Sequence, residues 1–240
     1  NGDSGSDGAP PAPPPPPAKP KDESEPGAGG NPKVEGSSAK AGERAYTVDK
    51  VASRKPGYTS YNVTINGTSG KQTIPVEMSD KDPNKTAKIE DVARALAQAP
   101  ELALAATKTV HVEPLGSGPY GVAGLAHSDG KVQIFGLEKD PKQLRDTILH
   151  ETGHEVGFAA KDGRITGMKD LEERWKQAEA KDGNFCSDYA KTNGTEDFAD
   201  TWRLYNKVKG TPQEAEERKK YAARFEIIDQ LMKKGIEPKK

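Results

Sequence analysis

The sequence has 240 residues, with 36 basic and 37 acidic side chains, 19 prolines and one cysteine. The balanced charge argues against a polyanion-binding protein, so we expect no nucleic-acid partner. Because Cys186 is the only cysteine, an intrachain disulfide and a cysteine-based metal site are excluded. No apolar run approaches 18 residues, so we expect no transmembrane segment.

Residues 1–45 differ in composition from the rest of the chain. They hold ten of the 19 prolines, no aromatic residue and only Val34 among Leu, Ile, Val and Phe. This is too little apolar surface to offset the entropy lost on ordering, and the Pro-rich run is typical of an extended spacer. We therefore expect a disordered tether over 1–45. By analogy with the Pro-rich leaders of bacterial surface lipoproteins, we expect an extracellular or cell-surface location, with a lipid-anchored tether as one form.

The remaining residues, 46–240, are enough for one domain with its own core. Its first part, 46–84, is expected to be rich in β-structure, because residues 59–78 alternate apolar and polar side chains around Asn66-Gly67 and Ser69-Gly70. A helix is predicted from Lys85 to the interruption at Pro100, and the segment ELALAAT that follows predicts a further helical turn.

A second β-rich segment precedes the C-terminal part. Residues 109–112 predict a strand, and residues 122–137 predict a hairpin around the turn Ser128–Gly130. We expect residues 122–126 to form an edge strand.

Helices are predicted over most of the remainder. The first begins with Asp140 as its N-cap and Pro141 as its first residue, and runs to Gly157. Further helices are predicted over 170–180, from Thr195 onward, and from Tyr221 to before Gly235. A sheet followed by helices predicts an α+β fold, with residues 85–240 as the part that carries the chemistry.

The first of these helices contains the motif HExxH, formed by His150, Glu151 and His154. Residues four apart lie on one face of a helix, so both imidazoles can bind one zinc ion while Glu151 faces a water on that ion. Two histidines with one further protein ligand and an open position describe a catalytic zinc site rather than a structural one.

The third ligand must come from elsewhere in the chain. A longer motif with a third histidine is excluded, because its last position is Ala160. Downstream, Glu196 and Asp200 share one face at the start of a predicted helix, so one can bind zinc while the other orients a ligand histidine. The alternative is that these carboxylates only stabilise the helix N-terminus. With the incomplete HExxH, we favour Glu196 as the ligand.

Four other side chains are of types that can take part in chemistry. Tyr189 lies seven residues before Glu196, where a phenol can donate a hydrogen bond to an oxyanion, or simply pack its ring. His111 and His127 are interpreted as strand and turn residues. Cys186 has no adjacent histidine and is not expected to be a nucleophile.

The segments HETGHEVGF and YAKTNGTEDFAD, with the hairpin VAGLAHSDGKVQIFGL just before them, resemble the gluzincin metallopeptidases that include anthrax lethal factor and the bacterial Pro-Pro endopeptidases. The resemblance covers about residues 85–235. It implies a zincin-like fold, zinc ligands His150, His154 and Glu196, Glu151 as general base and Tyr189 as oxyanion donor. Family members often carry Glu where Asp200 stands.

Together, the motif and the resemblance predict a zinc endopeptidase with one Zn²⁺ per chain. We expect a monomer that binds an extended peptide along the edge strand, with a preference for Pro-Pro bonds. Two alternatives remain: a non-catalytic binding or adhesion module on the same scaffold, and a zinc amidase that acts on the cell wall.

Overall fold

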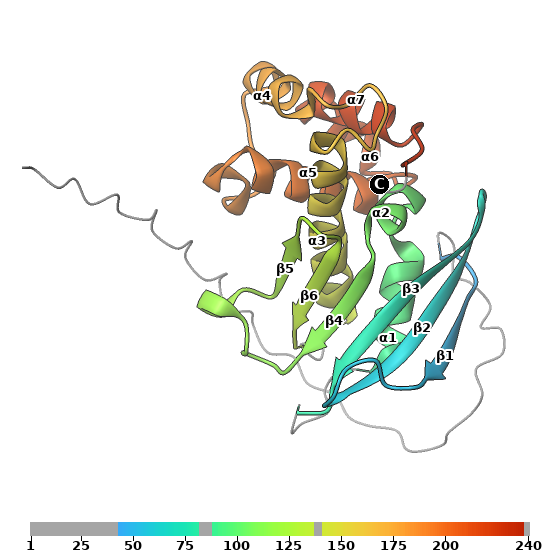
Figure 1. The fold of residues 1–240 in the computed structure, drawn as a ribbon. Coiled ribbons are helices and arrows are strands. Elements are labelled where there is room, and N and C mark those ends of the chain that lie inside the picture. Colours follow the sequence, from blue (N-terminus) through green and yellow to red (C-terminus); the bar gives the residue numbers. More distant parts are fainter. Residues whose placement is uncertain (1–42, 82–87, 137–140, 238–240) are drawn as a thin grey trace, which may run out of the picture.

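The computed structural model describes residues 43–81, 88–136 and 141–237. Its centre is a six-stranded mixed sheet in the order β1-β2-β3-β4-β6-β5 (Figure 1). The pairs β3–β4 and β4–β6 are parallel and the others antiparallel. The strands are β1 (Tyr46–Val51), β2 (Tyr58–Gly67), β3 (Gly70–Ser79), β4 (Thr109–Glu113), β5 (Gly124–His127) and β6 (Lys131–Phe135).

Both predicted hairpins are present. The first joins β2 to β3 with Gly67 opposite Gly70, and the second joins β5 to β6 with His127 opposite Lys131. The strand β5 lies at the end of the sheet, as expected, although it begins at Gly124 rather than at residue 122.

Helices form the rest of the described chain. They are α1 (Ile89–Gln98), α2 (Glu101–Ala106), α3 (Pro141–Lys161), α4 (Leu171–Asp182), α5 (Gly194–Val208), α6 (Glu214–Lys220) and α7 (Ala222–Leu231), with 3-10 turns η1 (Pro119–Gly121) and η2 (Tyr189–Thr192). The described chain thus combines a mixed sheet with helices, which agrees with the α+β prediction at that level. The expected helix start at Lys85 and the N-cap Asp140 lie outside the described residues.

The end of α3 and the presence of α6 differ from the sequence-based expectation. Helix α3 continues four residues beyond Gly157, because Ala159 and Ala160 are buried in the helical core, and it ends where Gly163 adopts a φ of 75°. Helix α6 was not predicted, because it buries no residue and so has no apolar periodicity to reveal it.

Two apolar clusters make up the core, and α3 belongs to both. Its first half packs Leu144, Ile148 and Leu149 against the sheet and α1. Its second half packs Val156 and neighbouring alanines against the C-terminal helices. Figure 1 shows α1 and α3 on one face of the sheet and α4 to α7 gathered beyond one end of it. The HExxH motif therefore lies where the two clusters meet.

The segment just before β1 already contacts the domain. The backbone of Arg44 bonds to Ala97, and its guanidinium donates hydrogen bonds to the carbonyls of Ala97 and Ala99. Of the expected tether over 1–45, residues 43–45 are described, and residues 1–42 lie outside the described part of the chain. None of the helices in the described ranges is both long and apolar enough to span a bilayer.

Candidate metal centre

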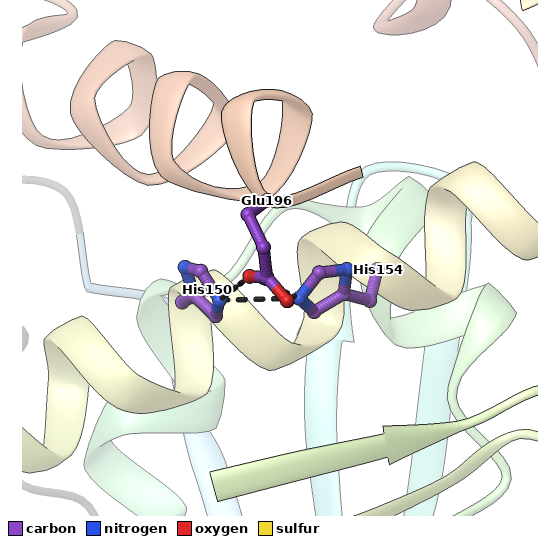
Figure 2. Close-up of side chains that lie close together, drawn as sticks. All are labelled: His150, His154 and Glu196. Atoms are coloured by element: carbon purple, nitrogen blue, oxygen red, sulfur yellow. Dashed lines mark hydrogen bonds and ion pairs between the residues drawn. The ribbon is translucent and has the colours of Figure 1, made fainter. Parts of the chain in front are cut away.

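Three side chains from α3 and α5 converge on one point. His150 Nε2 lies 3.1 Å from Glu196 Oε2, and His154 Nε2 lies 3.2 Å from the same oxygen. The two Nε2 atoms are 3.1 Å apart. Figure 2 shows the carboxylate of Glu196 reaching from α5 to the two imidazoles, which project from successive turns of α3.

This arrangement fits a zinc ion. With Zn–N and Zn–O bonds of about 2.0–2.1 Å, ligand atoms around a tetrahedral ion lie about 3.3 Å apart, close to the three observed separations. The donor set of two imidazoles and one carboxylate is also that of a catalytic zinc site, which keeps one position open. Among the described residues, these three form the one group of His, Cys, Asp or Glu side chains close enough to share an ion.

The local electrostatics favour positive charge at the same point. Burial acts to lower the pKa of His150, but hydrogen bonds with Asp200 and Glu196 outweigh it and raise the pKa to about 9. Burial acts to raise the pKa of Glu196, but hydrogen bonds with His150 and His154 lower it to about 2. The carboxylates around the two imidazoles thus stabilise positive charge at this point, and a metal ion that binds there would have to displace the proton from His150.

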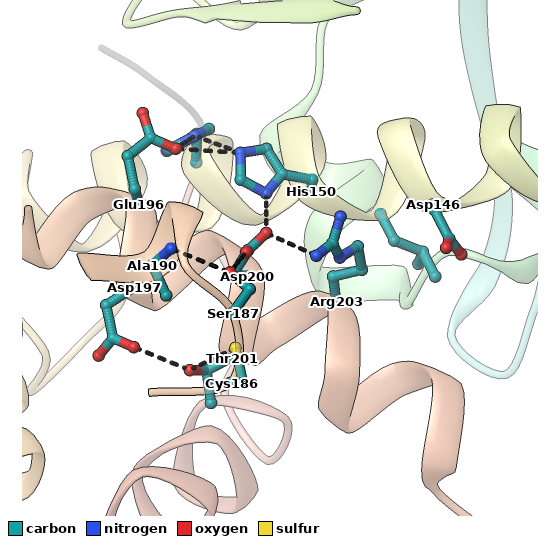
Figure 3. A network of polar contacts seen from close by, with 12 residues as sticks. Asp146, His150, Cys186, Ser187, Ala190, Glu196, Asp197, Asp200, Thr201 and Arg203 are labelled. Atoms are coloured by element: carbon teal, nitrogen blue, oxygen red, sulfur yellow. Dashed lines mark hydrogen bonds and ion pairs between the residues drawn. The ribbon is translucent and has the colours of Figure 1, made fainter. Parts of the chain in front are cut away.

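Asp200 orients His150 from behind. The His150 Nδ1 donates to Asp200 Oδ1 over 2.7 Å, which leaves Nε2 directed at the cluster. Arg203 Nη2 lies 3.0 Å from the same oxygen, and Ser187 donates to the other, Oδ2 (Figure 3). The pKa of Asp200 is lowered by His150 and Arg203 against the opposing effect of burial. The aspartate side chain of Asp200 is therefore long enough to reach His150.

His154 is supported differently. Its Nδ1 is buried and has no hydrogen-bond partner in the described part of the chain. The ring instead stacks on Phe158, with centroids 6.3 Å apart. The two imidazoles thus depend on different neighbours, His150 on a charged network and His154 on packing.

Glu151 lies between the cluster and the edge strand. It is 6% exposed, and burial raises the pKa of its carboxyl group above the usual range. A Cβ atom added at Gly124 would lie 2.5 Å from Glu151 Oε1, so the glycine permits this close approach of β5 to α3. The carboxyl group of Glu151 also accepts a hydrogen bond from the backbone of Ala126.

Tyr189 lies on the other side of His150. It begins the turn η2, and its ring centroid lies 5.8 Å from that of His150. Burial raises the pKa of Tyr189 to about 12, and the negative charges of Glu196, Glu151 and Asp200 add to this rise. The phenol thus remains a proton donor at neutral pH. The Tyr189 residue is 37% exposed.

Local structure in α5 sets the position of Glu196. The helix begins at Gly194, one residue before the expected start at Thr195. Its N-cap is Asn193, which has an extended backbone and accepts from the Glu196 backbone N–H over 2.9 Å. Glu196 therefore lies in the first turn, and α5 packs closely on α3 where Trp202 lies beside Gly153.

Other candidates from the sequence lie outside the cluster. His111 is on β4 and lies 4.0 Å from Glu113, and His127 is on β5 and bonds to Gln133. Burial raises the pKa of the Cys186 thiol to about 11, which argues against a nucleophile. The sequence did not single out Ser187, Arg203 or Gly124. Of these, only Arg203 had a local signal, its i+3 spacing from Asp200.

A search against models of known protein families finds no match, and a search of curated proteins finds no similar sequence.

Proposed function

We propose that the chain is a zinc-dependent endopeptidase with a zincin-like catalytic domain. The observation that carries the proposal is the convergence of His150, His154 and Glu196 within bonding distance of one ion, with Glu151 and Tyr189 adjacent. A structural zinc site would use four protein ligands and favour cysteine. Three ligands with a neighbouring carboxyl group and phenol instead match the needs of hydrolysis.

Each side chain has a defined task in this proposal. When bound, zinc supplies a Lewis acid that lowers the pKa of a water molecule towards 7. Glu151 takes a proton from the attacking water onto its carboxylate and later delivers it to the leaving amine. Tyr189 donates its phenolic hydrogen to the substrate carbonyl oxygen as negative charge develops there. Asp200 holds His150 in the tautomer that directs Nε2 to the ion.

Burial of Glu151 is what suits it to act as a base. In a low-dielectric environment the charged carboxylate is disfavoured, so its affinity for a proton increases. The best general base has a pKa near the working pH, and an ordinary exposed glutamate is too weakly basic. Contact with Gly124 and the nearby imidazoles keeps this carboxyl group at the site.

The substrate in this proposal is an extended peptide paired with β5. This strand has one free edge in the described sheet, lies against Glu151 and exposes Leu125 to solvent. Strand addition supplies affinity through the backbone, and side-chain pockets supply selection. We propose secreted or surface proteins as substrates, with cleavage at Pro-Pro bonds as the narrower form.

The experiment that tests the function is mass spectrometry of a diverse peptide library after incubation with the zinc-loaded protein. Glu151→Gln, which keeps the size of the side chain, is incubated in parallel. We expect cleavage by the wild-type protein alone, and the cleaved bonds give the preference. Equal cleavage by both proteins would remove Glu151 as the base. Cleavage by neither would favour a binding module or a non-peptide amide as substrate.

Zinc content tests the ligands separately from activity. We expect about one zinc per chain by elemental analysis, lost in His154→Ala because two remaining ligands hold zinc poorly. His127→Ala is the matched control, because it removes an imidazole that lies outside the cluster. Unchanged zinc in His154→Ala would refute the ligand assignment.

A further inference from the structure

Ser187 joins two parts of the site that come from different segments. Its hydroxyl donates to Asp200 Oδ2 on α5 and accepts from the backbone N–H of Ala190 over 3.0 Å (Figure 3). A serine hydroxyl has one donor hydrogen, and Ser187 directs it at Asp200. The turn that carries Tyr189 is thereby linked to the carboxylate that orients His150.

The two oxygens of Asp200 are divided between different partners. Oδ1 accepts from His150 and pairs with Arg203, whereas Oδ2 accepts from Ser187. The Asp200 side chain is 1% exposed, so water cannot readily replace any of these partners. Removal of the hydroxyl would leave Oδ2 short of a donor and the turn without its bond to α5.

The position of Tyr189 depends on this turn. Tyr189 is 37% exposed, and its side chain contacts the cluster through the His150 ring, 5.8 Å away between centroids, and through a hydrogen bond with Glu196. The turn η2 has only four residues, and Ala190 is its one buried member. An oxyanion donor must be held to within about half an ångström of its working position. The backbone bond from Ala190 to Ser187 restrains the turn that carries the phenol, in addition to these side-chain contacts.

We propose that Ser187 is a positioning residue that fixes Tyr189 relative to His150 by bonding at once to Asp200 and to the Tyr189 turn. This proposal rests on the proposed function. It predicts that loss of the hydroxyl slows the chemical step through Tyr189, with binding of zinc and peptide largely retained.

The test uses the zinc-loaded full chain and the best peptide from the library. Ser187→Ala should lower kcat about tenfold with KM within about twofold of wild type, and Ser187→Thr should restore most of the rate. In the Tyr189→Phe background, Ser187→Ala should change kcat less than twofold, because the group that it positions is already gone. Thr192→Ala is the matched control: it removes an exposed hydroxyl from the same turn and should leave kcat unchanged.

Hydrogen exchange gives a readout that needs no turnover. Ser187→Ala should speed amide exchange at least tenfold in a peptide covering residues 187–193, and leave exchange in α3 unchanged. Equal losses of kcat in the wild-type and Tyr189→Phe backgrounds would overturn the proposal, as would unchanged exchange in the turn. If the wild-type protein cleaves no peptide, the peptidase function fails, and hydrogen exchange alone then supports or refutes the link made by Ser187.

Discussion

Gly124 of β5 lies close to Glu151 of α3. A Cβ atom at position 124 would lie 2.5 Å from Glu151 Oε1 and 2.6 Å from its Cγ. Glu151 is buried. Either the carboxyl group or the strand must therefore shift if a side chain is added.

We predict that Gly124→Ala lowers kcat/KM at least tenfold and leaves zinc content unchanged, because the substitution displaces the base and not the ligands. Steady-state kinetics and elemental analysis of the purified variant measure both effects. Gly235→Ala is the control, since a Cβ there meets no atom within 4 Å. Wild-type kinetics in Gly124→Ala would show that the contact does not position Glu151.

The residues of the candidate site differ in how far the sequence alone can identify them. His150, Glu151 and His154 follow from the spacing within one helix, because the i, i+4 rule needs no tertiary information. Glu196 was inferred from chemistry, as the missing third ligand. Gly124 carries no such signal, because its contact with Glu151 arises only when β5 packs on α3.

At the scale of elements, the crossing of α3 and α5 sets the distance from Glu196 to the histidines. Gly153 allows this close approach: a Cβ there would lie 2.9 Å from Trp202 Cδ1, and Trp202 is fully buried. One turn later, a Cβ atom added at Gly157 would lie 3.7 Å from the nearest atoms of Phe198, an ordinary van der Waals distance. The two glycines of one helix thus differ in how much space they leave.

We predict that Gly153→Ala lowers the free energy of unfolding by up to about 2 kcal/mol, since an overpacking cost of about 1–3 kcal/mol is offset by a gain in helix propensity of about 1 kcal/mol. It should also weaken zinc binding by moving α5. Gly157→Ala, the matched control, should be neutral or stabilising. Urea unfolding of both variants with a zinc titration provides the measurement, and a stabilised Gly153→Ala would refute the packing argument.

The elements most accessible from sequence were those with local signals. Turn residues revealed the β2–β3 and β5–β6 hairpins, and apolar spacing revealed α1, α4, α5 and α7. The parallel pairs of β4 with β3 and β6 were not predicted, because strand order depends on how α1 and α3 pack on the sheet. The start of α5 was predicted at Thr195, one residue after its observed start at Gly194, because Asn193 and Thr195 are both good capping residues.

Glu101 links two elements, the β2–β3 turn and α2. The Thr68 backbone N–H donates to its carboxylate over 2.6 Å, and this bond is the main cause that lowers the pKa of Glu101. The Thr68 hydroxyl, the Ser69 N–H and Arg44 lower it further, and burial opposes them. Because the pKa is lower in the folded state, the contribution to stability is complete above the unfolded pKa and is lost as pH falls through the folded pKa.

We therefore predict that Glu101→Gln destabilises the protein at pH 7 by about 1 kcal/mol, a modest value because the carboxylate is partly exposed to solvent. The difference from wild type should shrink as the pH falls below about 4.5, where the unfolded carboxylate takes up a proton. Urea unfolding between pH 7 and pH 3.5 tests this. Glu172→Gln, an exposed glutamate in α4, is the control. A difference that stays constant with pH would exclude the charge as its cause.

At the scale of the whole molecule, α3 connects the sheet to the C-terminal helices. The candidate ligands come from both parts, His150 and His154 from the shared helix and Glu196 from the helical layer, while Gly124 comes from the sheet. Any relative movement of the two clusters would separate Glu151, the three candidate ligands and the edge strand. The burial in α3 agrees with this role, since nine consecutive residues from Ile148 to Val156 are buried.

The N-terminal boundary of the domain can be located by stepwise deletion. Composition predicts that residues 1–40 add no apolar core, so their deletion should leave the melting temperature unchanged. Deletion to residue 45 also removes Arg44, which bonds to Ala97 and Ala99 at the end of α1 and lies 3.9 Å from Glu101. We expect this second deletion to cost about 1–2 kcal/mol, or roughly 2–8 °C in melting temperature for a domain of this size.

Differential scanning calorimetry of both proteins makes the comparison, with Arg44→Ala in the full chain to show whether this one side chain accounts for the difference. A large shift on deleting 1–40 would place part of the Pro-rich segment within the folded domain, and equal melting temperatures for both deletions would show that the bonds of Arg44 do not contribute to stability.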